Sequence, residues 1–328
     1  MYSCYVWRFK KYNIIVDGGD CRTCFQQLLN NINAIKSSGN QIDLMILTHV
    51  DIDHIDGFLR LFMLENFDFS VIKEIWFNFG KDLNDLLNIG KEYIDLFIPE
   101  YDTEIGWGQG VSLDNLLEKN KIKKQIVMKF NKFNIGNAIF TILSPTKNIL
   151  KEFVKQGSKS YNKEETTNIS YLNDYNKSVL ELNDLPQDFS ISLNNKSSIA
   201  FLFEYENFKI LFLGDSDPRV ITQSLSELGY SEDRKLKLDV CKISHHASRH
   251  NTTNDLIKMI ECSNYIISSK HTTNGRPSKE CLSRIIYNSD GPVTFYCNYE
   301  LLWHNIFTNE EIEEYNIKFD TIDELILK

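Results

Sequence analysis

The chain lacks the long hydrophobic run of a membrane helix, since no stretch of its 328 residues reaches about 18 consecutive apolar positions. The segment from Met1 to Lys10 also lacks the basic-then-apolar order of a signal peptide. The seven cysteines are odd in number and scattered, which does not suit a disulfide framework. We therefore expect a cytoplasmic protein without membrane contact.

Several cofactor and nucleic-acid signatures are also missing. Neither a GxxxxGK[ST] loop nor a GxGxxG fingerprint is present, which weakens nucleotide-fuelled and dinucleotide-dependent functions. Cys21 and Cys24 form one CxxC, but a zinc ribbon needs a second pair, so we expect a structural or incidental role for them. The net charge of −9 is not the basic footprint of a protein that coats nucleic acid. Cleavage of a phosphodiester would therefore need metal ions as the local positive charge.

The chain does have enough apolar material for a sizeable core, with 42% hydrophobic and 12% aromatic residues. Strand and helix signals alternate in two blocks, which favours a layered α/β (α+β) protein with mixed sheets. One expected strand covers Ile126–Phe130. Residues 147–188 are rich in Asn, Lys, Ser and Glu and predict an insertion or mobile loop. We expect one domain over residues 1–328, ending in an acidic tail, 310–328, that docks as a helix or binds a partner.

The strongest chemical signal is the segment from Thr48 to Gly57, which reads THVDIDHIDG. Four possible metal ligands lie within six residues directly after an apolar strand: His49, Asp51, Asp53 and His54. Such a loop turns imidazoles and carboxylates toward neighbouring divalent ions. The alternative, an acidic solvated turn with helix-capping aspartates, explains one aspartate better than the whole string.

Two further strands end in potential ligands. The run Leu211-Phe-Leu-Gly-Asp215 delivers a carboxylate that either bridges two ions or caps a helix before Pro218, a capping role that suits Asp217 better. The run Cys241-Lys-Ile-Ser is followed by His245 and His246. Four of the seven histidines thus fall at predicted strand ends, whereas core histidines are more often scattered.

Four motifs occur in a fixed order along the chain: Asp17-Gly-Gly, the HxDxDHxxG string, a strand ending in Gly-Asp, and Ser-His-His-Ala-Ser. This ordered set resembles the metallo-β-lactamase fold superfamily. Within it, the chain looks most like the hydrolase domain of the DNA-uptake competence channel and its stand-alone bacterial relatives, which share HxDxDH. Asn195-Lys-Ser-Ser198 is similar to a further motif of these relatives. The resemblance implies a four-layer αββα sandwich of two mixed sheets with metals at one sheet edge.

The resemblance also implies residue roles. The metal ligands would be His49, Asp51, Asp53, His54, Asp215 and one of His245 and His246; we favour His245 and expect His246 to face the substrate. Asp17 would support the ligand loop. No histidine lies between His54 and Asp215, so the middle ligand of the superfamily is missing, and Asn195 or Ser198 stands near its place. We expect one or two divalent ions, zinc or manganese; the oxygen-rich set shifts the preference toward manganese or magnesium, or toward partial occupancy of one site.

We expect hydrolysis by a metal-bound hydroxide, most simply of a phosphodiester, with a nuclease as first choice. Asp53 or Asp215 would accept the proton of the water, and His246 or Arg276 would stabilise the developing negative charge. A basic stretch from Lys121 to Lys132 is either a phosphate-backbone track or, more simply, a solvated face. The alternatives are a hydrolase of a small ester, lactone or nucleotide signal, and a metal-poor interaction module that binds a protein partner through the insertion or the tail.

Overall fold

The computed structural model describes residues 5–9, 11–20, 22–90, 106–157, 173–269, 275–299 and 303–322. The chain divides into two compact units of interleaved segments. The first unit comprises residues 1–136, 145–166 and 193–199, and the second comprises 137–144, 167–192 and 200–328. Each unit has its own hydrophobic core.

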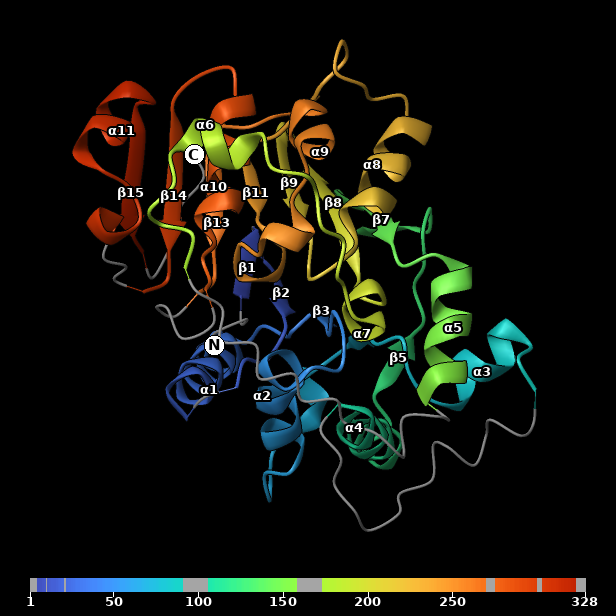
Figure 1. Cartoon of the computed structure of the whole chain (residues 1–328). Helices are drawn as coiled ribbons and strands as arrows, with labels where there is room; N and C mark the ends of the chain where they lie inside the picture. Colours follow the sequence, from blue (N-terminus) through green and yellow to red (C-terminus); the bar gives the residue numbers. More distant parts are fainter. Residues whose placement is uncertain are drawn as a thin grey trace. The chain divides into compact units, whose positions relative to one another are not determined.

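The first unit is built on a sheet in the order β1-β2-β3-β4-β5, in which only β1 and β2 are antiparallel (Figure 1). Its elements are β1 (Tyr5–Phe9), β2 (Tyr12–Val16), α1 (Arg22–Ser37), β3 (Leu44–Ile46), α2 (Ile52–Phe62), η1 (Phe69–Val71), β4 (Glu74–Trp76), α3 (Lys81–Leu87), α4 (Trp107–Lys119), β5 (Lys123–Gln125), β6 (Lys132–Ile135), α5 (Lys147–Gly157) and α7 (Leu193–Lys196). The inner parallel strand β3 is apolar and fully buried, and β4 buries Ile75 and Trp76, as expected for strands with both faces covered. The parallel strand β5, at the end of the sheet, is polar and partly exposed.

The second unit contains the strand order β15-β14-β13-β11-β9-β8-β7, in which β7, β8 and β9 pair antiparallel and the rest parallel (Figure 1). Its elements are β7 (Ala138–Ser144), α6 (Val179–Asn183), β8 (Ala200–Tyr205), β9 (Phe208–Phe212), α8 (Pro218–Glu227), β10 (Leu236–Lys237), β11 (Val240–Lys242), η5 (Ser244–His246), η6 (Arg249–Asn251), α9 (Asn254–Lys258), β12 (Ile260–Glu261), β13 (Asn264–Ile267), α10 (Lys279–Asn288), β14 (Val293–Cys297), η7 (Trp303–Asn305), α11 (Asn309–Glu314) and β15 (Ile317–Thr321). β10 and β12 form a separate parallel pair.

These elements confirm the expected α/β class with mixed sheets, consistent with a metallo-β-lactamase sandwich fold. The strand expected at Ile126–Phe130 is wrong, because strands flank this segment instead. The Val127 N–H donates to the Asn78 side chain at 2.8 Å. Phe130 has a φ of 69°, the left-handed region, which is incompatible with a strand.

The segment 147–188 differs in part from the expected insertion or mobile loop. Its first eleven residues form α5, which buries Leu150, Phe153 and Val154 in the core of the first unit. The short helix α6 follows later in the segment, and residues 158–172 lie outside the described ranges. Apolar side chains at i, i+3 and i+4 explain the helix, although the surrounding composition is polar. The expectation of a single domain stays a prediction.

The acidic tail predicted at the carboxyl end is largely ordered into a helix and a strand. The acidic segment from residue 310 forms most of α11 and then β15, which pairs in parallel with β14. Residues 323–328, the end of the predicted tail, and Cys21 of the CxxC pair lie outside the described residues. Cys24 is buried in α1. Within the described ranges, none of the helices combines the length and the apolar character of a membrane span.

Candidate metal-binding residues

Asp17, directly after β2, is the centre of a buried hydrogen-bond network in the first unit. Its Oδ1 accepts from the Thr48 N–H at 2.7 Å, and its Oδ2 accepts from the Thr48 hydroxyl at 2.9 Å. The same Oδ2 lies 2.8 Å from His54 Nδ1. Val16 of β2 pairs with Ile46 of the parallel strand β3. The residues that follow these two strands therefore meet at one sheet edge.

The two imidazoles of this cluster are oriented through their Nδ1 atoms. Because an ionised carboxylate only accepts, the contact with Asp17 places the proton of neutral His54 on Nδ1. His54 then carries its lone pair on Nε2, the atom available to a metal. His49 Nδ1 lies 3.1 Å from the Thr48 hydroxyl and 3.3 Å from that of Ser198. The ring centroids of His49 and His54 are 4.1 Å apart, and both residues are buried.

Each of these imidazoles has a carboxylate beside its Nε2 atom. Asp51 Oδ2 lies 3.5 Å from His49 Nε2, and Asp53 Oδ2 lies 3.8 Å from His54 Nε2. Asp51 precedes α2, but its side chain does not cap the helix and instead accepts from Asn194 Nδ2 at 2.9 Å. Burial raises the pKa of Asp51, but the hydrogen bond and charge of His49 and the Asn194 amide outweigh it, so the pKa is lowered. Asp51 is therefore an ionised oxygen donor at neutral pH.

Gly57 of the motif is required by a close approach of two backbones. The Gly18 N–H donates to the His54 carbonyl at 2.7 Å, and the Gly57 N–H donates to the Gly19 carbonyl at 2.8 Å. A Cβ on Gly57 would lie 1.9 Å from the Gly18 oxygen. The first unit thus docks α2 directly on the turn that holds Asp17, which explains why the sequence carries both Asp-Gly-Gly and the motif glycine.

Asp215 occupies the corresponding position in the second unit, after β9. Phe212 of β9 pairs with Lys242 of the parallel strand β11, and Gly214 turns the chain with a φ of 51°. Asp215 is buried. The capping role falls to Asp217, as expected, whose side chain accepts from the Arg219 N–H at 3.0 Å at the start of α8. Asp215 does not cap this helix, and its side chain instead lies near His245.

The turn after β11 has an uncommon backbone. His245, His246 and Ala247 have φ values of 47°, 57° and 61°, three successive left-handed residues that are not glycine. Such a conformation costs roughly 1–2 kcal/mol per residue. The turn is held by the His245 N–H, which donates to the Gly214 carbonyl at 3.1 Å, and by the Ala247 carbonyl, which accepts from the Ser278 N–H at 2.9 Å. Strain that the surroundings maintain in this way is typical of functional turns.

His245 contacts both a carboxylate and an amide. Its Nε2 lies 3.6 Å from Asp215 Oδ2, and its Nδ1 lies 2.9 Å from Asn251 Oδ1. Burial is the main cause that lowers the pKa of His245 to about 4; Asp215 opposes this shift, and the charge of Arg276 adds to it. His245 is therefore neutral at physiological pH, as a metal ligand needs to be.

The structure also describes the surroundings of the other predicted site residues. His246 is 1% exposed, and its Nδ1 contacts the Ser268 carbonyl oxygen. Asn195 is buried in α7, and Ser198 is the hydroxyl partner of His49 just before β8. Arg276 is half-buried in the loop before α10. Sequence reasoning missed the supporting roles of four polar residues: Thr48, Asn194, Asn251 and Ser268. Only Thr48 carried a signal, because it stands directly before the first histidine of the motif.

The donor set in each unit fits a divalent ion. Two ligand atoms about 2.0–2.1 Å from one ion at the tetrahedral angle lie about 3.4 Å apart. The Nε2-to-carboxylate distances of 3.5 and 3.8 Å in the first unit and 3.6 Å in the second are close to this value. Neutral imidazole with carboxylate suits zinc, manganese or iron. The residues therefore suit a metal, without selecting one.

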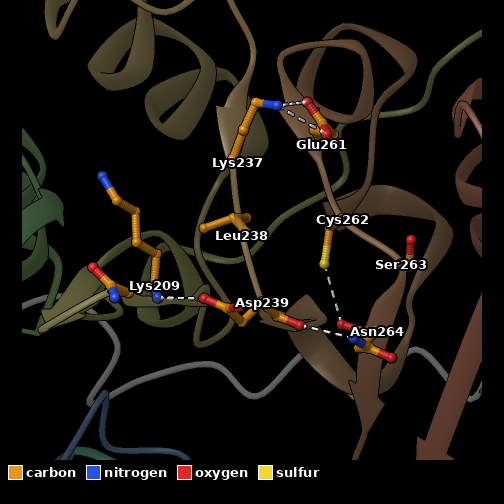
Figure 2. Close-up of a pocket in the computed structure, with 9 residues that line it drawn as sticks. Lys209, Lys237, Leu238, Asp239, Glu261, Cys262, Ser263 and Asn264 are labelled. Atoms are coloured by element: carbon orange, nitrogen blue, oxygen red, sulfur yellow. Dashed lines mark hydrogen bonds and ion pairs between the residues drawn. The ribbon is translucent and has the colours of Figure 1, made fainter. Parts of the chain in front are cut away.

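A cavity of about 330 Å³ lies elsewhere in the second unit, at the amino-terminal ends of β9, β11 and β13 (Figure 2). Its charged groups already have partners. Lys237 Nζ lies 3.3 Å from Glu261, Lys209 Nζ forms an ion pair with Glu204 at 2.7 Å, and Asp239 accepts from the backbone N–H of Lys209 at 2.7 Å. Burial raises the pKa of Cys262 to about 12, so this thiol is not a ready nucleophile. Asp215 and His245 follow the opposite ends of these strands, so the cavity does not serve them.

Two lysines of the basic stretch form ion pairs within the first unit. Lys123 forms an ion pair with Glu74. Lys124 is nearly buried and forms ion pairs with Asp114 and, at 3.2 Å, with Asp82. These intramolecular ion pairs do not favour a phosphate-backbone track in this part of the stretch, and the nearly buried Lys124 does not fit the expected solvated face either.

The chain matches no protein-family model and no curated protein. Solved structures of similar fold include the metallo-β-lactamase fold protein YhfI from Bacillus subtilis (10% identity, 98% of this chain, 89% of that chain, TM-score 0.41) and Zn²⁺-bound PqqB from Methylobacterium extorquens (10%, 98%, 86%, 0.42). The diiron β-hydroxylase CmlA from Streptomyces venezuelae (12%, 98%, TM-score 0.44) is matched over 51% of its length, so the present chain spans about half of it. Likenesses of this degree assign no activity to the chain.

Proposed function

We propose that the chain is a metal-dependent hydrolase that cleaves phosphodiester bonds and belongs with the competence-type hydrolases that its motifs resemble. The observation that carries this proposal is the buried contact of His54 Nδ1 with Asp17 at 2.8 Å. A carboxylate that orients an imidazole through Nδ1 is the usual support of a metal-ligating histidine. A histidine with a purely structural role in the core does not need two carboxylates, one at each ring nitrogen.

The ligands in this proposal come from both units. His49, Asp51, Asp53 and His54 would serve in the first unit, and Asp215 and His245 in the second. A divalent ion, when bound, acidifies water and neutralises negative charge on the substrate. The side chain of Asp53 is 20% exposed and that of Asp215 is 5% exposed. Asp53 is therefore the more accessible of the two proposed proton acceptors.

Arg276 is the proposed group for a substrate oxyanion. Its charge helps lower the pKa of both His245 and His250, behind burial as the main cause, so the guanidinium lies within electrostatic range of both rings. Among the described residues, no carboxylate forms an ion pair with Arg276. A guanidinium binds two phosphate oxygens at once, which favours a phosphoryl group over an acyl group.

A specific observation favours a small phosphodiester over a polynucleotide as the substrate. The ion pairs of Lys123 and Lys124 remove two cations from the only basic stretch that could follow a nucleic-acid backbone. The net charge of −9 points the same way. Within the proposed activity, we therefore place a small phosphodiester, such as a nucleotide signal, ahead of a polynucleotide as the substrate.

The experiment is hydrolysis of three substrates by the protein loaded with Mn²⁺ or Zn²⁺: single-stranded DNA, a cyclic dinucleotide and bis-p-nitrophenyl phosphate. Metal content is measured in parallel for His54→Ala and His245→Ala. The proposal expects chelator-sensitive cleavage of at least one phosphodiester and loss of metal in both variants. A protein that binds no divalent ion, or that loses metal in neither variant, would contradict it.

A further inference from the structure

Asn251 is a fully buried amide that links the two ligand-bearing turns of the second unit. It is 1% exposed and lies at the end of η6. Its Nδ2 donates to the carbonyl oxygen of Asp215 at 2.9 Å and to that of Ser216 at 3.2 Å. Its Oδ1 lies 2.9 Å from Nδ1 of His245. One side chain thus contacts the turn after β9 and the turn after β11.

These contacts determine which way the amide faces. Two backbone carbonyl oxygens can only accept hydrogen bonds, so the NH₂ group of Asn251 has to face Asp215 and Ser216. The Oδ1 atom of Asn251, which can only accept a hydrogen bond, then faces His245. The His245 Nδ1 has to be the donor in this contact and carries the ring proton. The lone pair of neutral His245 is consequently on Nε2, the atom that lies 3.6 Å from Asp215 Oδ2.

The position of Asn251 is itself fixed from α10. Arg284 is completely buried, and its NH1 group donates to the Arg249 carbonyl at 2.7 Å and to the Thr252 carbonyl at 2.9 Å. These carbonyls lie on either side of Asn251 in the chain. The other arm of the guanidinium forms an ion pair with Glu280, one turn earlier on the same helix. The loop that carries Asn251 is thereby clamped to a rigid helix.

From this geometry we infer that Asn251 is a positioning residue that selects the Nδ1–H tautomer of His245 and aligns it with Asp215 for a divalent ion. The inference rests on the proposed function only for the ion. Asn251 gives His245 what Asp17 gives His54, but with a neutral amide in place of a carboxylate. A neutral partner leaves the imidazole less electron-rich than a charged one, so His245 is the weaker donor of the two.

The decisive measurement is the ring tautomer of His245 by ¹⁵N chemical shifts in the metal-free protein at pH 7.5, with the signal assigned through His245→Gln. We expect the Nδ1–H tautomer in the wild type and a mixture of tautomers in Asn251→Ala. An Nε2–H tautomer in the wild type overturns the inference, and this arm needs no variant of Asn251 to fold.

The second measurement is the affinity for Zn²⁺ alone, by competition with a chelating dye. We expect Asn251→Ala to weaken binding 10–100-fold. The matched control is Asn264→Ala, which removes an amide that donates to the Asp239 carbonyl at 3.0 Å at the opposite sheet edge, and it should leave both affinity and tautomer unchanged. Equal losses in both variants would overturn the inference. If the wild type binds no Zn²⁺, the proposed function fails, whereas the tautomer still decides the role of Asn251.

Discussion

Replacement of Gly57 by alanine sets two known effects against each other. Gly57 lies inside α2, where alanine is favoured over glycine by about 1 kcal/mol. The added Cβ would, however, lie 1.9 Å from the oxygen and 2.5 Å from the carbonyl carbon of Gly18. Both are backbone atoms, so no side-chain rotation can relieve the overlap. Helix α2 would have to move away from the turn of Asp17.

The magnitude follows from what this movement breaks. The two backbone hydrogen bonds between the turn and α2, at 2.7 and 2.8 Å, would lengthen or be lost, at about 1 kcal/mol each. Overpacking at a rigid contact adds about 1–3 kcal/mol. These losses exceed the gain in helix propensity, so we expect Gly57→Ala to lower the free energy of unfolding by about 2–4 kcal/mol.

The assay is urea unfolding followed by circular dichroism, together with metal content by elemental analysis. The matched control is Gly291→Ala, where a Cβ would meet nothing within 4 Å and the free energy of unfolding should change by less than about 1 kcal/mol. Because the displaced helix carries His54, metal content should fall in Gly57→Ala as well. A Gly57→Ala protein as stable as the wild type, with its metal retained, would refute the packing argument.

Three further predictions concern the supporting contacts. Asp17→Asn should weaken Zn²⁺ binding 10–100-fold in a dye competition assay, because the amide replaces the carboxylate that orients His54; unchanged affinity would contradict this role. Arg284→Met should cost about 3–5 kcal/mol in urea unfolding, because Glu280 becomes a buried charge without its partner, and adding Glu280→Met should recover part of the loss. In the metal-free protein, the folded-state pKa of His245 of about 4 lies below its ordinary 6.5. The unfolded chain therefore binds the proton first, and the free energy of unfolding should fall by about 3 kcal/mol as the pH drops from 6.5 to 4. His245→Gln should lack this part of the pH dependence, and an identical profile in that variant would show that another group is responsible.

The sequence allowed the α/β class and the candidate ligands to be predicted because both depend on local order. An apolar strand followed by His49 or Asp215 is visible in a short window, and parallel strands bring such ends to one edge. The helix α5 was not predicted, because its three buried apolar residues are diluted by lysine and asparagine. The strand expected at Ile126–Phe130 failed because the segment's apolar character was taken for strand periodicity.

The supporting residues escaped prediction for a different reason. Asn251 acts on Asp215, 36 positions earlier in the chain, through one side-chain amide. Asn194 contacts Asp51 over 143 positions. A buried amide or hydroxyl has no sequence pattern of its own, because its partner depends on the tertiary fold. Asp17 and Ser198 could be named from the sequence because the motif resemblance covers them, whereas the amides of Asn194 and Asn251 could not.

The pairing of β9 with β11 limits how the length of the chain can vary. Ile210, Leu211 and Phe212 face Val240, Cys241 and Lys242 in register. Deleting one residue within either strand would send Asp215 or His245 to the other side of the sheet. The connection between α8 and β10, residues 228–235, lies outside this pairing. Insertions should therefore be tolerated there, and a tag or reporter placed in that loop would leave the register of both turns intact.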